Sequence, residues 1–218
     1  MTRLRPIDLV CPVCDNHFRS QSVVSTNSHG GKRTDFHEYA VGEQPLPHLV
    51  HMCSGCGFSG ADRDFVEGSE VSSFVRSQVL SILTPRLAED RLDSASDRYA
   101  AAAQVAEWKG EGPRRVADQL LRAAWCCVED ADHEGERFYR RAAAQKFADA
   151  LAHDGVVPPT ERAVIAYLIG ELWRRVGEAT LADAWLARVE GEIVDPEEQQ
   201  WVMAAARQQR DSPREWFT

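Results

Sequence analysis

The spacing of hydrophobic positions changes along the chain and divides it into two regions. Before about residue 65, short stretches of alternating apolar and polar residues, such as 22–25 and 49–52, lie between turn-forming residues, as β-strands do. After about residue 90, apolar residues recur every three to four positions, as on one face of an α-helix. The pattern predicts a small β domain at residues 1–67 and a mainly α-helical domain at residues 68–218.

Start and stop signals bound several helices in the second region. Pro113 suits the first position of a helix, and Gly155 and Gly177 suit the position just after a helix ends. Asp195 and Glu198 have the spacing of a capping box, which favours a helix start at Asp195. The predicted helices are 70–83, 94–108, 113–129, 136–153, 160–176, 180–189 and 195–207.

A weak internal repeat lies within the helical region. In each of its two copies, a small residue is followed four and seven positions later by apolar residues. Each copy lies on the second helix of a predicted helix pair. The copies are Ala143, Phe147 and Ala150, then Ala182, Leu186 and Val189. Gly170 lies near the position where tetratricopeptide repeats carry a small residue so that two helices can approach. We expect an antiparallel array resembling tetratricopeptide repeats, with a generic helical bundle as the alternative.

Composition and charge bear on the class of partner. The 218 residues are 44% hydrophobic and 27% charged, which suits a chain with a sizeable core rather than a disordered one. The formal net charge of -9 repels phosphate backbones, and the basic residues occur as short pairs among acids. The sequence shows neither the apolar stretch of a signal peptide nor one of about 18 residues that could span a membrane. We therefore expect a cytoplasmic protein without a membrane partner.

Four of the six cysteines form two C-x-x-C pairs, which are the clearest chemical signal in the sequence. The pairs are Cys11 with Cys14 and Cys53 with Cys56. In a reducing compartment such cysteines are metal ligands more often than disulfides. A C-x-x-C turn presents two thiolates to adjacent corners of a zinc tetrahedron, so two turns complete it. The sequence predicts one structural Zn²⁺ bound by these four residues.

The residues around the pairs support this interpretation. Gly57 follows the second pair and Asp15 follows the first, and both residue types tolerate the left-handed conformation in which a zinc knuckle ends. We expect the long segment between the pairs to hold a hairpin and an insertion around Gly30 and Gly31. A redox dithiol is the main alternative, but it usually starts a helix in a β-α-β unit, which the pattern does not predict. An iron–sulfur or other metal centre is a further alternative.

The remaining polar residues predict no catalytic site. Five histidines in the first region are interpreted as surface residues or neighbours of the metal site: His17, His29, His37, His48 and His51. Asp35, His37 and Glu38 form an acid–base group without an accompanying nucleophile or phosphate-binding loop. Cys127 lies on an apolar helix face, whereas Cys126 points towards a second packed face. Four thiolates leave no open position on zinc, so we predict no enzyme activity.

The motifs Cys11-Pro-Val-Cys14, Thr34-Asp35-Phe36 and Cys53-Ser-Gly-Cys56-Gly-Phe58 resemble those of a bacterial family catalogued as domain of unknown function 2225. Weaker similarity continues through the helices, for example at 167–172, and covers most of the chain. The resemblance implies a zinc-ribbon-like region followed by tetratricopeptide-like helices, and it implies no established activity. Many zinc knuckles carry Gly and Pro where this chain has Asp15 and Ser54-Gly55.

These observations favour a non-catalytic protein-interaction module. Its stacked helices would offer a concave surface to a protein or peptide, and the sequence predicts no particular oligomeric state. The alternative is association with nucleic acid through the ribbon, using Arg3, Arg5, Lys32 and Arg33. A third hypothesis places an enzyme site around Asp35, between the ribbon and the helices.

Overall fold

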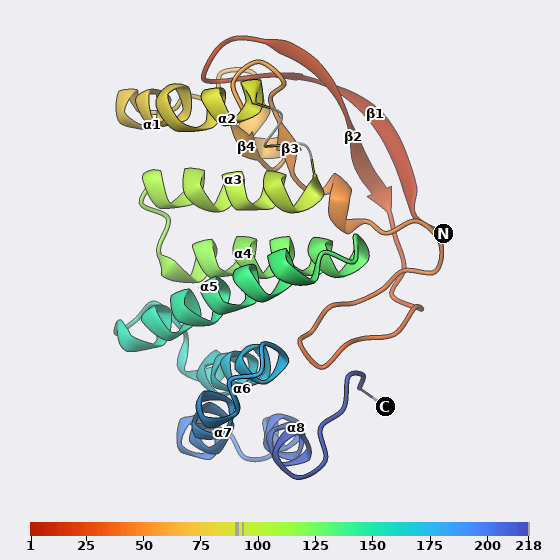
Figure 1. Cartoon of the computed structure of the whole chain (residues 1–218), viewed down its shortest axis with the longest axis vertical. Coiled ribbons are helices and arrows are strands. Elements are labelled where there is room, and N and C mark those ends of the chain that lie inside the picture. Colours follow the sequence, from red (N-terminus) through yellow and green to blue (C-terminus); the bar gives the residue numbers. More distant parts are fainter. Residues whose placement is uncertain (90–91, 93, 218) are drawn as a thin grey trace.

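The computed structural model describes residues 1–89, 92 and 94–217. Two small antiparallel hairpins lie at one end of a stack of helices (Figure 1). The strands are β1 (Arg3–Val10), β2 (His17–Ser25), β3 (His51–Met52) and β4 (Ser59–Gly60). The helices are α1 (Ser73–Gln78), α2 (Thr84–Ala88), α3 (Ala95–Trp108), α4 (Pro113–Glu129), α5 (His133–Ala152), α6 (Pro159–Arg175), α7 (Ala179–Arg188) and α8 (Gln200–Asp211).

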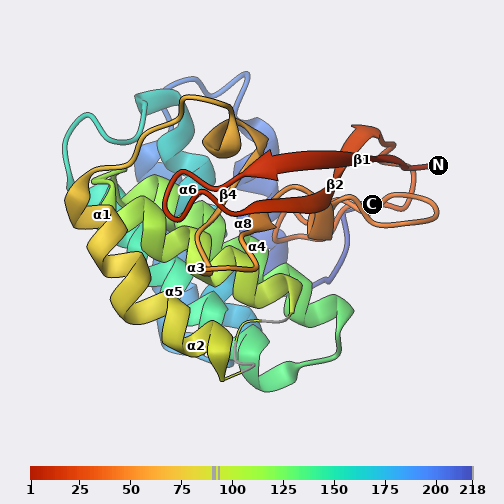
Figure 2. The same cartoon turned by 90° about the horizontal axis from the view of Figure 1, so that it is seen from above.

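The helical stack turns partway along its length. In Figure 1, α3, α4 and α5 lie across the view, while α6, α7 and α8 are seen nearly end-on. Successive helices from α3 to α7 pack against one another, so neighbours in sequence are neighbours in space. Seen from above, the β1–β2 hairpin crosses the end of the stack (Figure 2). The predicted fold class, a mainly α-helical antiparallel array with a small N-terminal β region, is confirmed.

The first C-x-x-C pair forms the turn of the β1–β2 hairpin. β1 pairs with β2 so that Val10 lies opposite His17, and Cys11 and Cys14 fall in the connection between them. The strand expected at 22–25 lies within β2. Between the two cysteine pairs, an antiparallel bridge joins Lys32 to Glu38 beside the expected insertion at Gly30 and Gly31, while β2 pairs with β1, which precedes Cys11.

Most predicted helices are present, and the largest difference is at α8. This helix begins at Gln200 rather than at Asp195. Asp195 Oδ1 accepts the backbone N–H groups of Glu197 and Glu198, at 3.0 and 3.1 Å. The bond from Glu198 is one half of the predicted capping box. The other half is replaced, because the backbone N–H of Asp195 donates to Gln199 Oε1 over 2.9 Å instead of to Glu198. The helix predicted at 70–83 begins at Ser73 and continues through a π-helical turn into α2.

Two large groups of buried residues form the core. The larger one lies among α4, α5, α6, α7 and α8. The other lies beneath the hairpins, where the cysteines pack against Val79 and Leu83 and against Val105 of α3. This second group contains residues from both sides of the expected domain boundary near residue 67, and the division itself stays a prediction. No helix in the described part of the chain is long and apolar enough to cross a membrane.

Gly170 allows α6 and α7 to approach closely. A Cβ atom at this position would lie 2.7 Å from Leu186 Cγ and 3.0 Å from the Leu186 backbone nitrogen. The G170A substitution should therefore lower the free energy of unfolding by about 1–2 kcal/mol, because overpacking outweighs the gain in helix propensity. Urea unfolding followed by circular dichroism measures the change.

The matched control is G191A. A Cβ atom at Gly191 would have no neighbour within 4 Å, so this substitution should change stability by less than about 0.5 kcal/mol. Equal stability of G170A and the wild type would contradict the close approach of α6 and α7.

Candidate metal centre

The two C-x-x-C turns have matching backbone geometry. In the first, the N–H of Asp15 donates to the carbonyl of Cys11 over 2.9 Å, and in the second, Gly57 donates to Cys53 over 2.8 Å. Asp15 and Gly57 have φ values of 57° and 79°, the left-handed conformation expected for both positions. Each pair therefore lies in a compact knuckle whose closing residue tolerates this backbone.

The two knuckles bring the four sulfur atoms together. All four Sγ atoms lie within 4.8 Å of one another. The Sγ atoms of Cys11 and Cys56 are 3.6 Å apart, and those of Cys14 and Cys53 are 3.5 Å apart. A tetrahedral Zn²⁺ with bonds of about 2.3 Å separates its sulfur ligands by about 3.8 Å. The donor set therefore fits one tetrahedral metal ion.

Nearby polar groups favour negative charge on the sulfurs. The N–H of Val13 lies 3.4 Å from Cys11 Sγ, and that of Gly55 lies 3.3 Å from Cys53 Sγ. Hydrogen bonds with Cys11 and Cys56 lower the pKa of Cys53. The hydrogen bond with Cys53 raises the pKa of Cys11 to about 12. A bound cation would replace the shared protons and favour thiolates at all four positions.

The helical region holds both knuckles in place. Arg76 of α1 donates to the carbonyl of Pro12, over 2.9 Å, and to that of Val13. Thr84 of α2 donates its hydroxyl to the carbonyl of Cys56 over 3.0 Å. The sequence did not indicate these contacts, because Arg76 and Thr84 belong to no motif near the cysteines.

His51 connects the two hairpins. Its side chain is buried, with Nδ1 2.7 Å from Ser20 Oγ and Nε2 2.6 Å from Asp62 Oδ1. Ser22 donates to the other oxygen of Asp62 over 2.7 Å. The chain of hydrogen bonds holds β2 against the β3–β4 hairpin. Among the histidines expected at the surface or beside the metal, His17 is exposed but His51 is buried by these partners.

Asp35 anchors the segment between β2 and β3 to three helices. Its side chain is fully buried, and it accepts hydrogen bonds from Arg140 Nη1 at 2.6 Å and Trp125 Nε1 at 3.1 Å. Arg175 Nε lies 3.9 Å away. Burial alone would raise the pKa of Asp35, but Arg140 and Arg175 hold it below its ordinary range. Asp35 is therefore an ionised structural anchor.

The side chains of His37 and Glu38, the other members of the acid–base group, contact residues other than Asp35. His37 stacks on Trp125, with centroids 4.9 Å apart and planes 7° apart, and burial lowers the pKa of His37 to about 4. Glu38 instead pairs with Lys32 over 3.1 Å at the surface. The geometry supports a packed loop and gives a substrate no access to Asp35.

Cys126 and Cys127 are both buried among the helices. Burial raises the pKa of Cys126 to about 12 and that of Cys127 to about 11, so both are protonated at neutral pH. Cys127 is a core residue as predicted, and Cys126 contributes to a second packed face.

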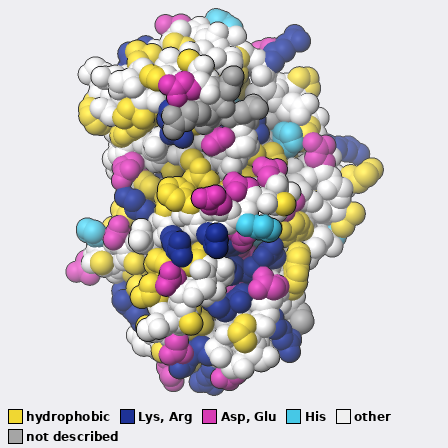
Figure 3. All heavy atoms as spheres, viewed as in Figure 1, with side chains coloured by type: hydrophobic (Ala, Val, Ile, Leu, Met, Phe, Trp, Pro, Cys, Tyr) yellow, Lys and Arg dark blue, Asp and Glu magenta, His cyan; other side chains and the backbone are white. Residues whose placement is uncertain are grey.

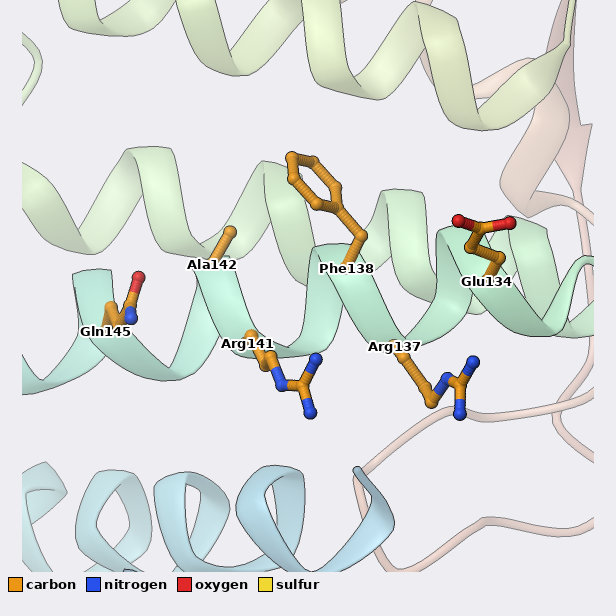
Figure 4. Close-up of a pocket in the computed structure, with 6 residues that line it drawn as sticks. All are labelled: Glu134, Arg137, Phe138, Arg141, Ala142 and Gln145. Carbon is orange, nitrogen blue, oxygen red and sulfur yellow. The ribbon is translucent and has the colours of Figure 1, made fainter. Parts of the chain in front are cut away.

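A second candidate site is a hollow of about 540 Å³ along the outer face of α5. Its lining residues are Glu134, Arg137, Phe138, Arg141, Ala142 and Gln145. Phe138 is 64% exposed, a high value for a phenylalanine. In Figure 4, Phe138 and Glu134 point to one side of α5, and Arg137 and Arg141 point to the other. Figure 3 shows hydrophobic side chains among charges of both signs on this view of the stack.

Comparison with known proteins identifies a family. The family model described as "Uncharacterized protein conserved in bacteria (DUF2225)" matches residues 6–212, which include both cysteine pairs and the helices. Comparison with curated proteins finds no match, and comparison with solved structures finds none either.

Proposed function

The chain belongs to the bacterial family DUF2225, and from this premise we propose that it is a non-catalytic protein-interaction module built on a structural zinc site. The family description supplies no activity, so the proposal rests on the two candidate sites. The metal centre would stabilise the hairpins, and the helical stack would present the binding surface.

Zinc is the metal that the donor set favours. Cys11, Cys14, Cys53 and Cys56 supply four soft sulfur donors, and soft donors select Zn²⁺ or iron over magnesium and calcium. Four protein ligands complete a tetrahedral site and leave no position for water or substrate. The ion would hold two knuckles together and supply no reaction. A reducing cytoplasm would keep the thiols available for it.

The exposed aromatic ring on α5 is the observation that carries the interaction proposal. Large apolar side chains in well-defined hollows are common anchors of protein–protein interfaces, and arginine is enriched beside them. Phe138 projects from α5 on the same side as Glu134, whereas Arg137 and Arg141 project on the other side (Figure 4). Arg141 pairs with Glu178 over 3.1 Å. This surface suits a protein segment that presents an apolar side chain to Phe138 and a carboxylate to the side of α5 that carries Arg137.

The nucleic-acid alternative has less support. Of its four cations, Lys32 pairs with Glu38 and Arg33 pairs with Glu215, each over 3.1 Å. These carboxylates reduce the positive charge that a phosphate backbone would meet, and the net charge of -9 opposes binding further. We therefore favour a protein partner.

The interaction surface is tested by a photo-crosslinking amino acid placed at position 138 of the full-length protein in the native bacterium. We expect a crosslinked adduct of defined mass, because Phe138 lies at the centre of the proposed contact. The adduct should decrease at least about fivefold when Arg137 and Arg141 are replaced by glutamate, which reverses the local charge.

The matched control carries the crosslinker at position 74. Phe74 of α1 is also exposed, at 56%, but lies outside the hollow. Adducts of the same mass from both positions, or none from position 138, would contradict the proposal.

A further inference from the structure

The segment 214–217 is extended and pairs with residues 32–34 through an antiparallel bridge between Arg33 and Trp216. The N–H of Thr34 donates to the carbonyl of Glu215 over 3.0 Å, and the N–H of Phe217 donates to the carbonyl of Lys32 over 3.0 Å. Extended peptides bind exposed strand edges in this way, with backbone bonds giving affinity and side chains giving specificity. The edge at residues 32–34 therefore already holds a peptide segment of the chain itself.

Three arginines converge on the carboxylate of this segment. Glu215 accepts hydrogen bonds from Arg33 Nη2 at 3.1 Å, from Arg174 Nη2 at 3.0 Å, and from Arg175 Nη1. Burial alone would raise the pKa of Glu215, but Arg175 and Arg174 lower it. Charge-assisted bonds of this kind select an acidic side chain at this position.

Aromatic side chains receive the two residues that follow Glu215. The ring of Phe217 stacks on Phe36, with centroids 5.8 Å apart and planes 13° apart. The ring of Trp216 lies 5.3 Å from that of Tyr39. These contacts favour aromatic residues in the bound segment.

The receiving side of this site is held by residues outside the segment. The side chain of Glu171 is fully buried. It accepts hydrogen bonds from Arg174 Nε at 2.8 Å and from Arg175 Nε at 2.6 Å. The hydroxyl of Tyr167 donates to the carbonyl of Thr34 over 2.9 Å and fixes the strand edge. With the segment removed, these bonds would still position both guanidinium groups. The site is therefore preorganised for an anion.

Two residues of the bound segment are more exposed than the three arginines that receive Glu215. The side chain of Glu215 is 52% exposed, and Trp216 is 44% exposed, whereas the side chain of Arg175 is 4% exposed. Segments whose side chains are partly exposed open locally at a lower free-energy cost than buried helices. The segment can thus leave while the receiving residues stay in place.

We propose that this groove, formed by residues 32–34, Phe36, Arg174 and Arg175, binds an extended segment of a partner protein. The segment would carry an acidic residue followed two positions later by an aromatic residue, and the chain's own residues 214–217 occupy the groove until they are displaced. This inference rests on the proposed interaction function but concerns a different surface from the hollow on α5.

A partner protein explains this arrangement better than a second copy of the chain. A tethered segment competes at an effective concentration on the order of millimolar. The identical segment of another copy makes the same contacts and gains nothing over the tethered one. A partner segment with further contacts gains affinity and displaces it.

Fluorescence anisotropy tests the groove with a labelled peptide, Ser-Pro-Arg-Glu-Trp-Phe, which has the sequence of residues 212–217. The metal-loaded full-length protein is compared with a full-length variant carrying Glu215→Lys and Phe217→Ala, whose own segment binds weakly. We expect the variant to bind the peptide at least about tenfold more tightly than the wild type, because the competitor is lost.

A peptide with lysine in place of glutamate is the matched control and cannot misfold. It should bind neither protein, and equal binding of both peptides would overturn the proposal, as would no binding of the first peptide by a folded variant. By light scattering we expect wild-type and variant protein to have the same mass. A wild-type dimer that dissociates in the variant would assign the groove to a second copy and would also overturn the proposal.

Hydrogen exchange of the wild-type protein gives a test that needs no substitution. The amides of Thr34 and Phe217 should exchange at least about tenfold faster than buried amides of α6, since the segment opens locally. Equal rates would show that the segment leaves only on global unfolding and would overturn the proposal. A crosslink at position 138 without peptide binding would refute the groove alone, because Phe138 does not line it.

Discussion

Replacement of Cys53 by serine should abolish metal binding and unfold the hairpins around the knuckles. Cys53 is fully buried and its Sγ lies in the four-sulfur cluster, where a serine hydroxyl is a poor zinc ligand. Metal binding contributes about 10–16 kcal/mol to folding in small zinc domains, and the region around the cluster has a small core of its own. We expect a loss of at least about 3 kcal/mol, because contacts with α1 and α3 preserve part of the structure.

Hydrogen exchange resolved by residue measures where this loss falls. Amides of β1 to β4 should lose protection in C53S, while those of α5 and α6 should keep it. The control is C126A, which alters a buried cysteine outside the cluster and should cost about 1–2 kcal/mol without loss of metal. Retained metal and protection in C53S would refute the role of Cys53 as a ligand.

Replacement of Asp35 by alanine should destabilise the protein by about 3–5 kcal/mol, because it leaves the buried charge of Arg140 without its main partner. The pair joins Asp35 to α5 over 2.6 Å, and both side chains have no exposed surface. The lowered pKa of Asp35 adds a pH dependence. Its contribution is fully present above the unfolded-state pKa and is lost as the pH falls through the lower folded-state pKa. Urea unfolding at several pH values measures both effects.

Two variants separate this buried charge effect from a general effect of removing an acid. D8A breaks the exposed pair of Asp8 with Arg19, whose side chains are 84% and 85% exposed, and should cost less than about 1 kcal/mol. The double variant with Asp35→Leu and Arg140→Met should be more stable than D35A, because it leaves no unpaired buried charge. Similar losses in D35A and D8A would contradict the anchoring role.

Local sequence patterns predicted the elements that depend on neighbouring residues. The C-x-x-C spacing predicted two knuckles, and the residue after each pair adopts the expected left-handed conformation. Ser94 starts α3 through a capping box with Asp97, close to the predicted start at residue 94. Gly170 meets Leu186 where the repeat pattern expected a close approach of two helices. Each of these features is decided within a few residues or by one helical repeat.

Long-range pairing could not be predicted in the same way. Asp35 and Arg140 are 105 residues apart, and their pairing depends on how the long segment before β3 crosses the stack. Phe36 adopts a φ of 71°, a conformation that its residue type does not favour. The groove for 214–217 combines residues near 33 with residues near 175, which are far apart in the sequence, so no local motif indicated it. The sequence indicated Asp35 only as part of a weak acid–base group, because its role depends on Trp125 and Arg140, which only the fold brings near.

The metal content of the purified protein tests the central claim most directly. Elemental analysis of protein isolated without added metal, combined with X-ray absorption at the metal edge, identifies the ion and its ligands. The proposed zinc site predicts about one zinc per chain, surrounded by four sulfur atoms at about 2.3 Å. Protein that folds without stoichiometric metal, or a metal bound mainly by nitrogen or oxygen, would contradict it.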